Sequence, residues 1–265
     1  MSVHTEQGGV LMAGISGISG NSYNYYATHI ASGKRINSAA DDASGATIAE
    51  KEKSQIGATT QAASNTQEGI KALNIADGAM SGITDYLDRI KELSVKASNG
   101  ILTDADKSAI QSEIDENLKA IDQIGSQATY NTKPLLDGST MDIASSPDGS
   151  GVTIGGATST TEALGLKGYS VMGDFDISQV DAAIDKVSSD RSSYGASTNA
   201  LEYSYNYSQI AIENLNSANS RTEDLDMAQA ISDMKRENVL QSYRTMMQKQ
   251  QSDDENQVNR LLMGI

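Results

Sequence analysis

Few side chains in this sequence could carry out acid–base, nucleophilic or metal chemistry. The two histidines, His4 and His29, lie in the first thirty residues, cysteine is absent, and no HExxH pattern occurs. A catalytic nucleophile needs a base within reach, and a thiolate or histidine metal site needs several ligands together. We therefore expect surface or packing roles for both histidines, no enzymatic activity, and no bound metal or cofactor.

Three pairs of carboxylates are the next candidates for a chemical site: Asp104/Asp106, Asp174/Asp176 and Asp224/Asp226. A calcium-binding loop needs more oxygen ligands and a central glycine, which these pairs lack. Negative charge at the start of a helix is favourable because it complements the helix dipole. Thr103 followed by Asp106 also resembles a capping box. We interpret the pairs as helix-start residues.

Three tyrosines alternate along the chain at Tyr203, Tyr205 and Tyr207. On a helix such neighbours face different sides. Packing in the core or between subunits is therefore favoured over a binding cage.

The charge balance excludes several classes of function. The net charge is −15 at pH 7, and phosphate backbones and anionic membranes repel such a chain, so we expect no nucleic-acid partner. No window approaches the ~18 apolar residues of a membrane span, so we expect no membrane insertion. The first Lys or Arg is Lys34, so we expect that any export does not use a cleaved signal peptide.

The elements that must position these residues are mainly helical. Hydrophobic residues make up only 38% of the chain, with one Phe and no Trp, which suits narrow apolar stripes better than a large globular core. Pro134 and Pro147 are the only prolines, so long uninterrupted helices are possible elsewhere.

The apolar spacing predicts a helix from about 43 to 98, a second from Thr103, and helical structure again from about 176 to 262. The first stripe comprises Ile56, Ala63, Ile70, Leu73, Met80, Ile83, Leu87 and Ile90. Ser220–Glu223 reads as a capping box and predicts a new helix or a sharp break.

In residues 129–175 apolar residues no longer recur at helical spacing, and Pro and Asp-Gly sequences typical of turns occur. The residues from Met141 to Ile143 and from Val152 to Ile154 are predicted to form a β-hairpin around Asp148-Gly149. We expect this small β element and no large separate domain.

Both ends of the chain carry apolar residues without an evident partner in the core. They include Leu11, Ile15 and Ile18 near one end, and Ile231, Met234, Val258 and Leu261 near the other. Five glycines among residues 8–20 weaken the first segment as an isolated helix. We expect both ends to become helical by pairing, and their apolar residues to be critical for assembly.

The expected fold is an elongated antiparallel helical bundle or coiled coil with a small β-hairpin element. Residues 1–40 and 221–265 would form the two halves of a terminal domain. Residues 41–220 would form the helical core domain, with the hairpin within about 129–175.

Several blocks of sequence resemble bacterial flagellin. They are ASGKRINSAADDASG at 31–45, LDRIKELSVKASNG at 87–100, SSDRSSYGASTNALE at 188–202 and NSANSRTEDLDMAQAISDMKRENVL at 216–240. The resemblance implies a subunit that polymerises into the extracellular flagellar filament and serves motility. It implies export in an unfolded state through the flagellar type III apparatus, terminal helices that line a central channel, and only the two inner domains of the family.

The resemblance also implies partners. These are other copies of the chain, the filament cap, the hook–filament junction proteins and an export chaperone. Arg89, Leu93 and Glu113 match flagellin positions that contact an animal Toll-like receptor and also neighbouring subunits.

Two other readings stay open at the level of sequence. A hook–filament junction protein has flagellin-like ends but does not form a self-polymer. A secreted helical adhesin or signalling ligand would also not polymerise, and the paired-end pattern weighs against it.

Overall fold

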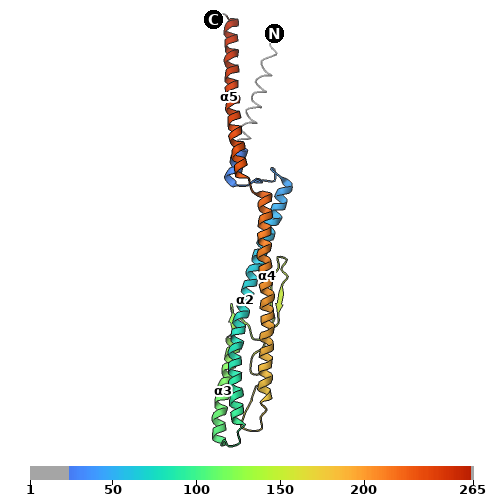
Figure 1. Cartoon of the computed structure of the whole chain (residues 1–265), viewed down its shortest axis with the longest axis vertical. Helices are drawn as coiled ribbons and strands as arrows, with labels where there is room; N and C mark the ends of the chain where they lie inside the picture. The colour runs from blue at the N-terminus through green and yellow to red at the C-terminus, as the bar shows by residue number, and fades with distance from the viewer. Residues whose placement is uncertain (1–23, 264–265) are drawn as a thin grey trace. The chain divides into compact units, whose positions relative to one another are not determined.

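The structure, a computed structural model, describes residues 24–263, apart from the side chain of Met263 (Figure 1). A short helix covers 24–32. It is followed by α2 (Ala43–Ala97), α3 (Asp104–Gln127), β1 (Thr129–Tyr130), β2 (Lys133–Pro134), β3 (Met141–Ile143), β4 (Val152–Ile154), α4 (Ser178–Glu223) and α5 (Met227–Met263). The mainly helical class is confirmed.

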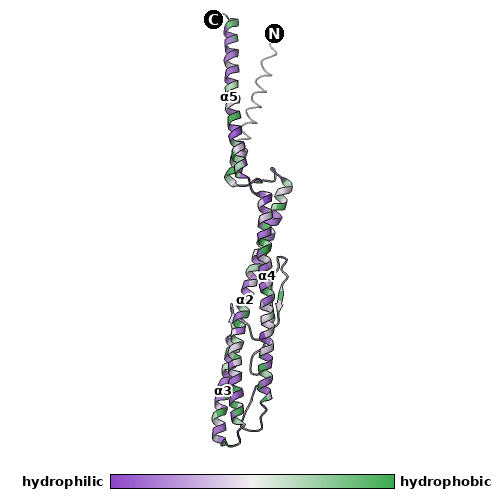
Figure 2. Ribbon diagram, viewed as in Figure 1, coloured by the Kyte–Doolittle hydropathy of each residue, from purple (hydrophilic) through white to green (hydrophobic). Residues whose placement is uncertain are grey.

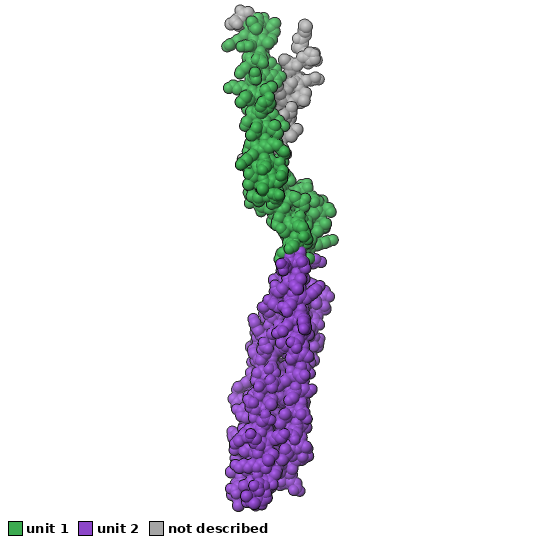
Figure 3. All heavy atoms as spheres, viewed as in Figure 1, with its two compact units in different colours: residues 1–54, 215–265 green, residues 55–214 purple. Residues whose placement is uncertain are grey.

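The chain divides into two compact units (Figure 3). Unit 2 is the continuous stretch 55–214. Unit 1 combines residues 1–54 with 215–265. The boundaries between the two units fall within the residue ranges of α2 and α4.

The core of unit 2 lies between α2, α3 and α4. The predicted α2 stripe is buried from Leu73 to Ile90, and Ile114 and Ile121 of α3 are completely buried beside it. On α4 the buried residues recur every seven positions, at Val180, Val187, Tyr194 and Leu201. This heptad spacing is that of a coiled-coil seam.

Two ion pairs fix the antiparallel register of α2 and α4 in unit 2. Asp77 lies 2.9 Å from Arg191, and Lys91 lies 2.7 Å from Asp181. Partners later in α2 meet residues earlier in α4, as antiparallel helices require.

The start of α3 follows the predicted capping box. The Thr103 side chain accepts a hydrogen bond from the Asp106 amide, and the Asp106 carboxylate accepts one from the Thr103 amide. Together they satisfy two amides that the helix leaves without partners. The α3 prediction is confirmed at its first residue.

Residues 129–175 form two hairpins and an irregular segment. The predicted pairing of β3 with β4 is confirmed, with Met141 opposite Ile154. The second hairpin, β1–β2, turns through Asn131 and Thr132, both at positive φ. The irregular segment buries Leu166 and Val171 in the core of unit 2, so it adds to the bundle and forms no separate domain.

The break near residue 220 occurs as predicted, but its cap is different. Ser220–Glu223 remain in the last turn of α4, so the capping-box assignment there is wrong. The new helix α5 begins at Met227, and the Asp226 carboxylate accepts a hydrogen bond from the Gln229 amide. The physical reason is local: an aspartate immediately before the helix reaches its free amides, and Ser220 instead donates to Asp224 at 2.5 Å.

Over residues 24–263, no helix has an apolar stretch long enough to cross a membrane. The same part of the chain holds no group of three or more His, Asp or Glu side chains placed to bind a metal ion.

Candidate assembly surfaces

Two segments of unit 1 that are far apart in sequence meet at a polar junction. Residues 33–35 run antiparallel to 223–225, with Lys34 opposite Asp224. The Arg35 amide donates to the Glu223 carbonyl at 2.7 Å, and the Leu225 amide donates to the Gly33 carbonyl at 3.0 Å. This short ladder joins the two halves of unit 1.

Glu223 is the charged centre of this junction. Its side chain is 8% exposed and lies 2.7 Å from both the Lys34 and the Lys53 ammonium groups. Burial alone would raise the pKa of Glu223, but hydrogen bonds and charge attraction from the two lysines outweigh it, so the pKa is lowered. The site is thus built to hold an ionised carboxylate.

No sequence signal predicted this junction. The local sequence indicates a capping box for Glu223, whereas its partners stand more than 160 residues earlier. The resemblance blocks at 31–45 and 216–240 contain Lys34 and Glu223, but a pairwise contact between them follows only from the tertiary structure.

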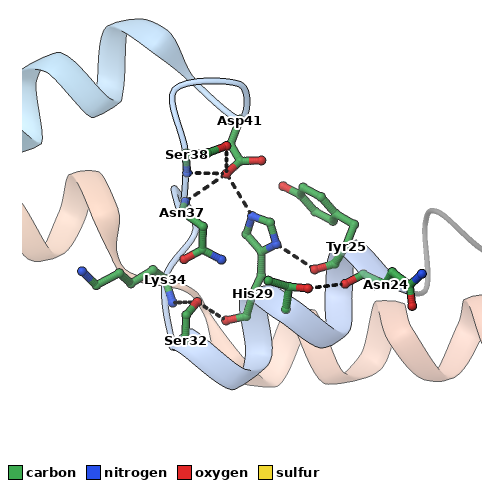
Figure 4. Close-up of polar contacts among 9 residues, drawn as sticks. Asn24, Tyr25, His29, Ser32, Lys34, Asn37, Ser38 and Asp41 are labelled. Carbon is green, nitrogen blue, oxygen red and sulfur yellow. Dashed lines mark hydrogen bonds and ion pairs between the residues drawn. The ribbon is translucent and has the colours of Figure 1, made fainter.

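His29 is buried and lies close to Lys34 in the chain and in space (Figure 4). The Tyr25 carbonyl accepts a hydrogen bond at 2.7 Å from His29 Nδ1, so this nitrogen carries a proton. His29 Nε2 lies 3.4 Å from Asp41. His4 is outside the described residues.

Asp41 in turn closes the loop that follows the helix 24–32 (Figure 4). Its carboxylate accepts hydrogen bonds from the amides of Ser38 and Asn37, each at 2.9 Å. These two hydrogen bonds, Ser38 first, hold the pKa of Asp41 below its usual range. The cluster orients the chain entering α2 and offers no free nucleophile.

Carboxylates of the three Asp pairs accept hydrogen bonds from backbone amides at helix starts. Asp106 and Asp226 cap α3 and α5, and the Asp176 carboxylate accepts a hydrogen bond from the Ser178 amide at the start of α4. The helix-start interpretation is therefore confirmed for one member of each pair.

The apolar residues predicted to matter for assembly lie on α5. Ile231, Val258 and Leu261 are 36%, 54% and 82% exposed, and Met234 is half-buried. Figure 2 shows hydrophobic residues spread along α5 among hydrophilic ones. Leu11, Ile15 and Ile18 lie outside the described residues.

Two of the three predicted receptor-contact residues are joined at the surface of unit 2. Arg89 donates to Glu113 through Nε at 2.9 Å and Nη2 at 2.6 Å, and to Glu92 at 3.0 Å. Leu93 is 2% exposed and packs in the core. A direct contact with a partner at this place would therefore involve Arg89 and Glu113.

Comparison with known proteins identifies this arrangement of helices. The model of the bacterial flagellin N-terminal helical region matches residues 15–141, and that of the C-terminal helical region matches residues 177–262. The chain belongs to the bacterial flagellins. It is a structural subunit of the flagellar filament, located outside the cell.

Flagellins from several bacteria are similar over most of the chain. A flagellar filament 33 kDa core protein of Treponema phagedenis is 35% identical, over 80% of this chain and 82% of its own. A flagellin of Bacillus subtilis is 33% identical, over 80% of this chain and 83% of its own. A crystal structure of Bacillus cereus flagellin aligns with 55% of this flagellin and 88% of its own chain, at 24% identity and a TM-score of 0.49.

Proposed function

We propose that this flagellin completes its folding by polymerisation, because α5 has apolar residues on more sides than one helical partner can cover. Large apolar residues occur as exposed neighbours along α5: Val239 with Leu240, Met246 with Met247, and Leu261 with Leu262. Adjacent residues on a helix point about 100° apart. The three pairs together cover more of the helix circumference than the stripe of about 100° that one helical partner typically buries.

The free energy available from covering these residues is substantial. Leu261 and Leu262 alone are 82% and 79% exposed. Full burial of one such side chain contributes roughly 1.5–3 kcal/mol. Part of this gain offsets the entropy lost when the chain ends become ordered, which is the balance expected for folding coupled to binding.

In this proposal, residues 1–40 and 221–265 together form the terminal domain, which lines the central channel of the filament. Residues 41–220 form the surrounding helical core. Subunits leave the cell unfolded through the flagellar type III apparatus and polymerise under the filament cap. An export chaperone and the hook–filament junction proteins are the other partners.

Removal of residues 241–265 tests the mechanism. We expect the truncated protein to keep the far-ultraviolet circular dichroism and thermal unfolding of unit 2, because the core of that unit lies within 55–214. We expect no filament growth by electron microscopy at concentrations at which the full chain polymerises. Normal filaments from the truncated protein would contradict coupled folding and assembly.

The same electron microscopy separates the two alternatives. A junction protein or a non-polymerising adhesin would give no long filaments from the purified full-length chain. Extended filaments of the single purified protein exclude both alternatives.

We also propose that the Arg89–Glu113 surface is a docking contact, either for a neighbouring subunit or for the animal Toll-like receptor. The observation that favours it is the exposed Arg89 guanidinium, which donates three hydrogen bonds and so holds the carboxylates of Glu113 and Glu92 beside it. A receptor-binding assay with monomeric protein, repeated on Arg89→Ala, tests the receptor role. Lys119→Ala is the matched control, because Lys119 forms a similar exposed pair with Glu116. No binding by the wild-type monomer rejects the receptor role.

A further inference from the structure

The outward face of α4 in unit 2 has an unusual combination of exposure and lack of charge. Tyr203, Tyr207 and Ile210 are 77%, 73% and 60% exposed. They stand four and three residues apart, so they lie on one side of the helix, and the expectation of different sides is wrong for Tyr203 and Tyr207. Tyr194 and Leu201, on the opposite side, are buried.

Polar but uncharged and small residues extend this face in both directions. The exposed residues on the same side are Ala196, Asn199, Ala200, Asn206 and Asn214. Between Arg191 and Glu213 the sequence contains a single charged residue, Glu202. Both Glu202 and Glu213 are exposed and border the face. We refer to these five residues, together with Tyr203, Tyr207 and Ile210, as the uncharged α4 face.

The uncharged α4 face is not part of the core of unit 2. The heptad residues of α4 already fill the seam with α2, and the tyrosines project away from it. Aromatic enrichment with depletion of charge is the composition of the centre of a protein–protein interface. The face is therefore free for a partner.

Charge identifies the kind of partner. Two copies of this chain, each with a net charge of −15, repel each other over most of their surfaces. Copies can approach with the least electrostatic cost where neither presents a charge. A cationic partner would instead be attracted to the acidic parts of the surface.

A polymer that grows head to tail needs two different surfaces that fit each other. A second uncharged stretch exists in unit 2, on α2, where no charged residue occurs between Lys53 and Glu68. Gly57, Thr60, Gln61 and Ser64 are exposed there at helical spacing. Small and amide residues supply adaptable hydrogen bonds beside the aromatic anchors of an interface.

We propose that the uncharged α4 face of one subunit packs against this exposed α2 surface of a neighbouring copy in the filament. The contact lies in unit 2 and is separate from the terminal helices. It rests on the proposed polymerisation and adds to it a specific lateral surface.

Single charge insertions test the contact in the full-length chain. We expect Tyr203→Glu and Tyr207→Glu to raise the critical concentration for filament formation by about tenfold or more, because they place an unpaired charge in the interface. Gln61→Glu should have a similar effect through the opposite surface. Met172→Glu is the matched control, since Met172 is 48% exposed in unit 2 but lies outside both surfaces.

Circular dichroism of the monomers confirms that the exposed substitutions leave the fold intact. Chemical iodination gives an independent readout: Tyr203 and Tyr207 should react in monomers and be protected in wild-type filaments. The proposal is overturned if both tyrosine variants have the same critical concentration as Met172→Glu. This holds even if the variants lose affinity for another protein. A normal Gln61→Glu filament overturns the assignment of α2 as the opposite surface. Failure of the wild type to polymerise would instead reject the proposed function.

Discussion

Glu223 shows how one side chain can hold together two ends of a chain. It accepts from Lys34 and Lys53 through its carboxylate, while its own carbonyl accepts from the Arg35 amide. The carboxylate is almost fully buried, whereas each lysine is more than 40% exposed. Neutralising Glu223 would therefore cost the two lysines little, because water already solvates them. The backbone ladder around Glu223 would lose the ion pairs that support it.

The junction should weaken in acid. Because the pKa of Glu223 is lowered below its ordinary value of 4.5, its contribution to stability is complete above that value. The contribution is lost as the pH falls through the lower pKa of the folded protein. We expect hydrogen exchange at the Arg35 and Leu225 amides to report this loss.

At neutral pH, Glu223→Gln should destabilise the junction by about 1–3 kcal/mol. The exchange of the same two amides should then accelerate by about tenfold or more. Glu213→Gln is the control, because Glu213 is exposed on the same helix. Equal protection in the Glu223 variant and the wild type would show that the backbone ladder holds without the carboxylate.

Thr132 is a β-branched residue at positive φ. Its φ is 65° in the two-residue turn of β1–β2, where a β-branched side chain is strained and glycine is preferred. We expect Thr132→Gly to stabilise unit 2 by about 1 kcal/mol in urea unfolding. Thr153→Gly in β4 should destabilise it, because there the substitution adds flexibility to a strand and removes the hydrogen bond that Thr153 donates to Asp142.

At the scale of the element, α4 has one buried face and one exposed face. Leu201 is completely buried, while Tyr203, two residues later, is 77% exposed. Leu201→Ala should lower the free energy of unfolding by about 2–5 kcal/mol, because it leaves a cavity. Tyr203→Ala should change it by less than about 0.5 kcal/mol. Similar losses in urea unfolding for the two variants would mean that the tyrosine face belongs to the monomer core.

The α3 helix depends on its start. Thr103→Ala removes one half of the capping box and should cost about 1 kcal/mol in the unfolding of unit 2. Ser112→Ala, in the exposed middle of the same helix, is the control and should be close to neutral. The comparison requires only equilibrium denaturation of the monomer.

At the scale of the whole molecule, charge opposes assembly and apolar surface drives it. Copies with a net charge of −15 repel each other over about 30 Å at 0.01 M salt but over only about 10 Å at 0.1 M. We expect the critical concentration for polymerisation to fall severalfold over this range, measured by light scattering and sedimentation. A rise with salt would indicate that ion pairs between subunits, not uncharged faces, dominate assembly.

The sequence by itself determined the helices, the hairpin and the family. Apolar spacing placed α2 and α3 to within a residue, and the short-range pairing of Thr103 with Asp106 and of β3 with β4 was predictable because the partners are close along the chain. The resemblance blocks, which the family matches bear out, led to the filament.

The tertiary structure alone decided which residues meet across the chain. It placed Glu223 between Lys34 and Lys53, moved the start of α5 to Met227, buried Leu93, and left Tyr203 and Tyr207 exposed. Periodicity assigns a residue to a side of its helix, but burial depends on which other helix covers that side. That choice is made by packing between segments more than a hundred residues apart, which no local pattern encodes.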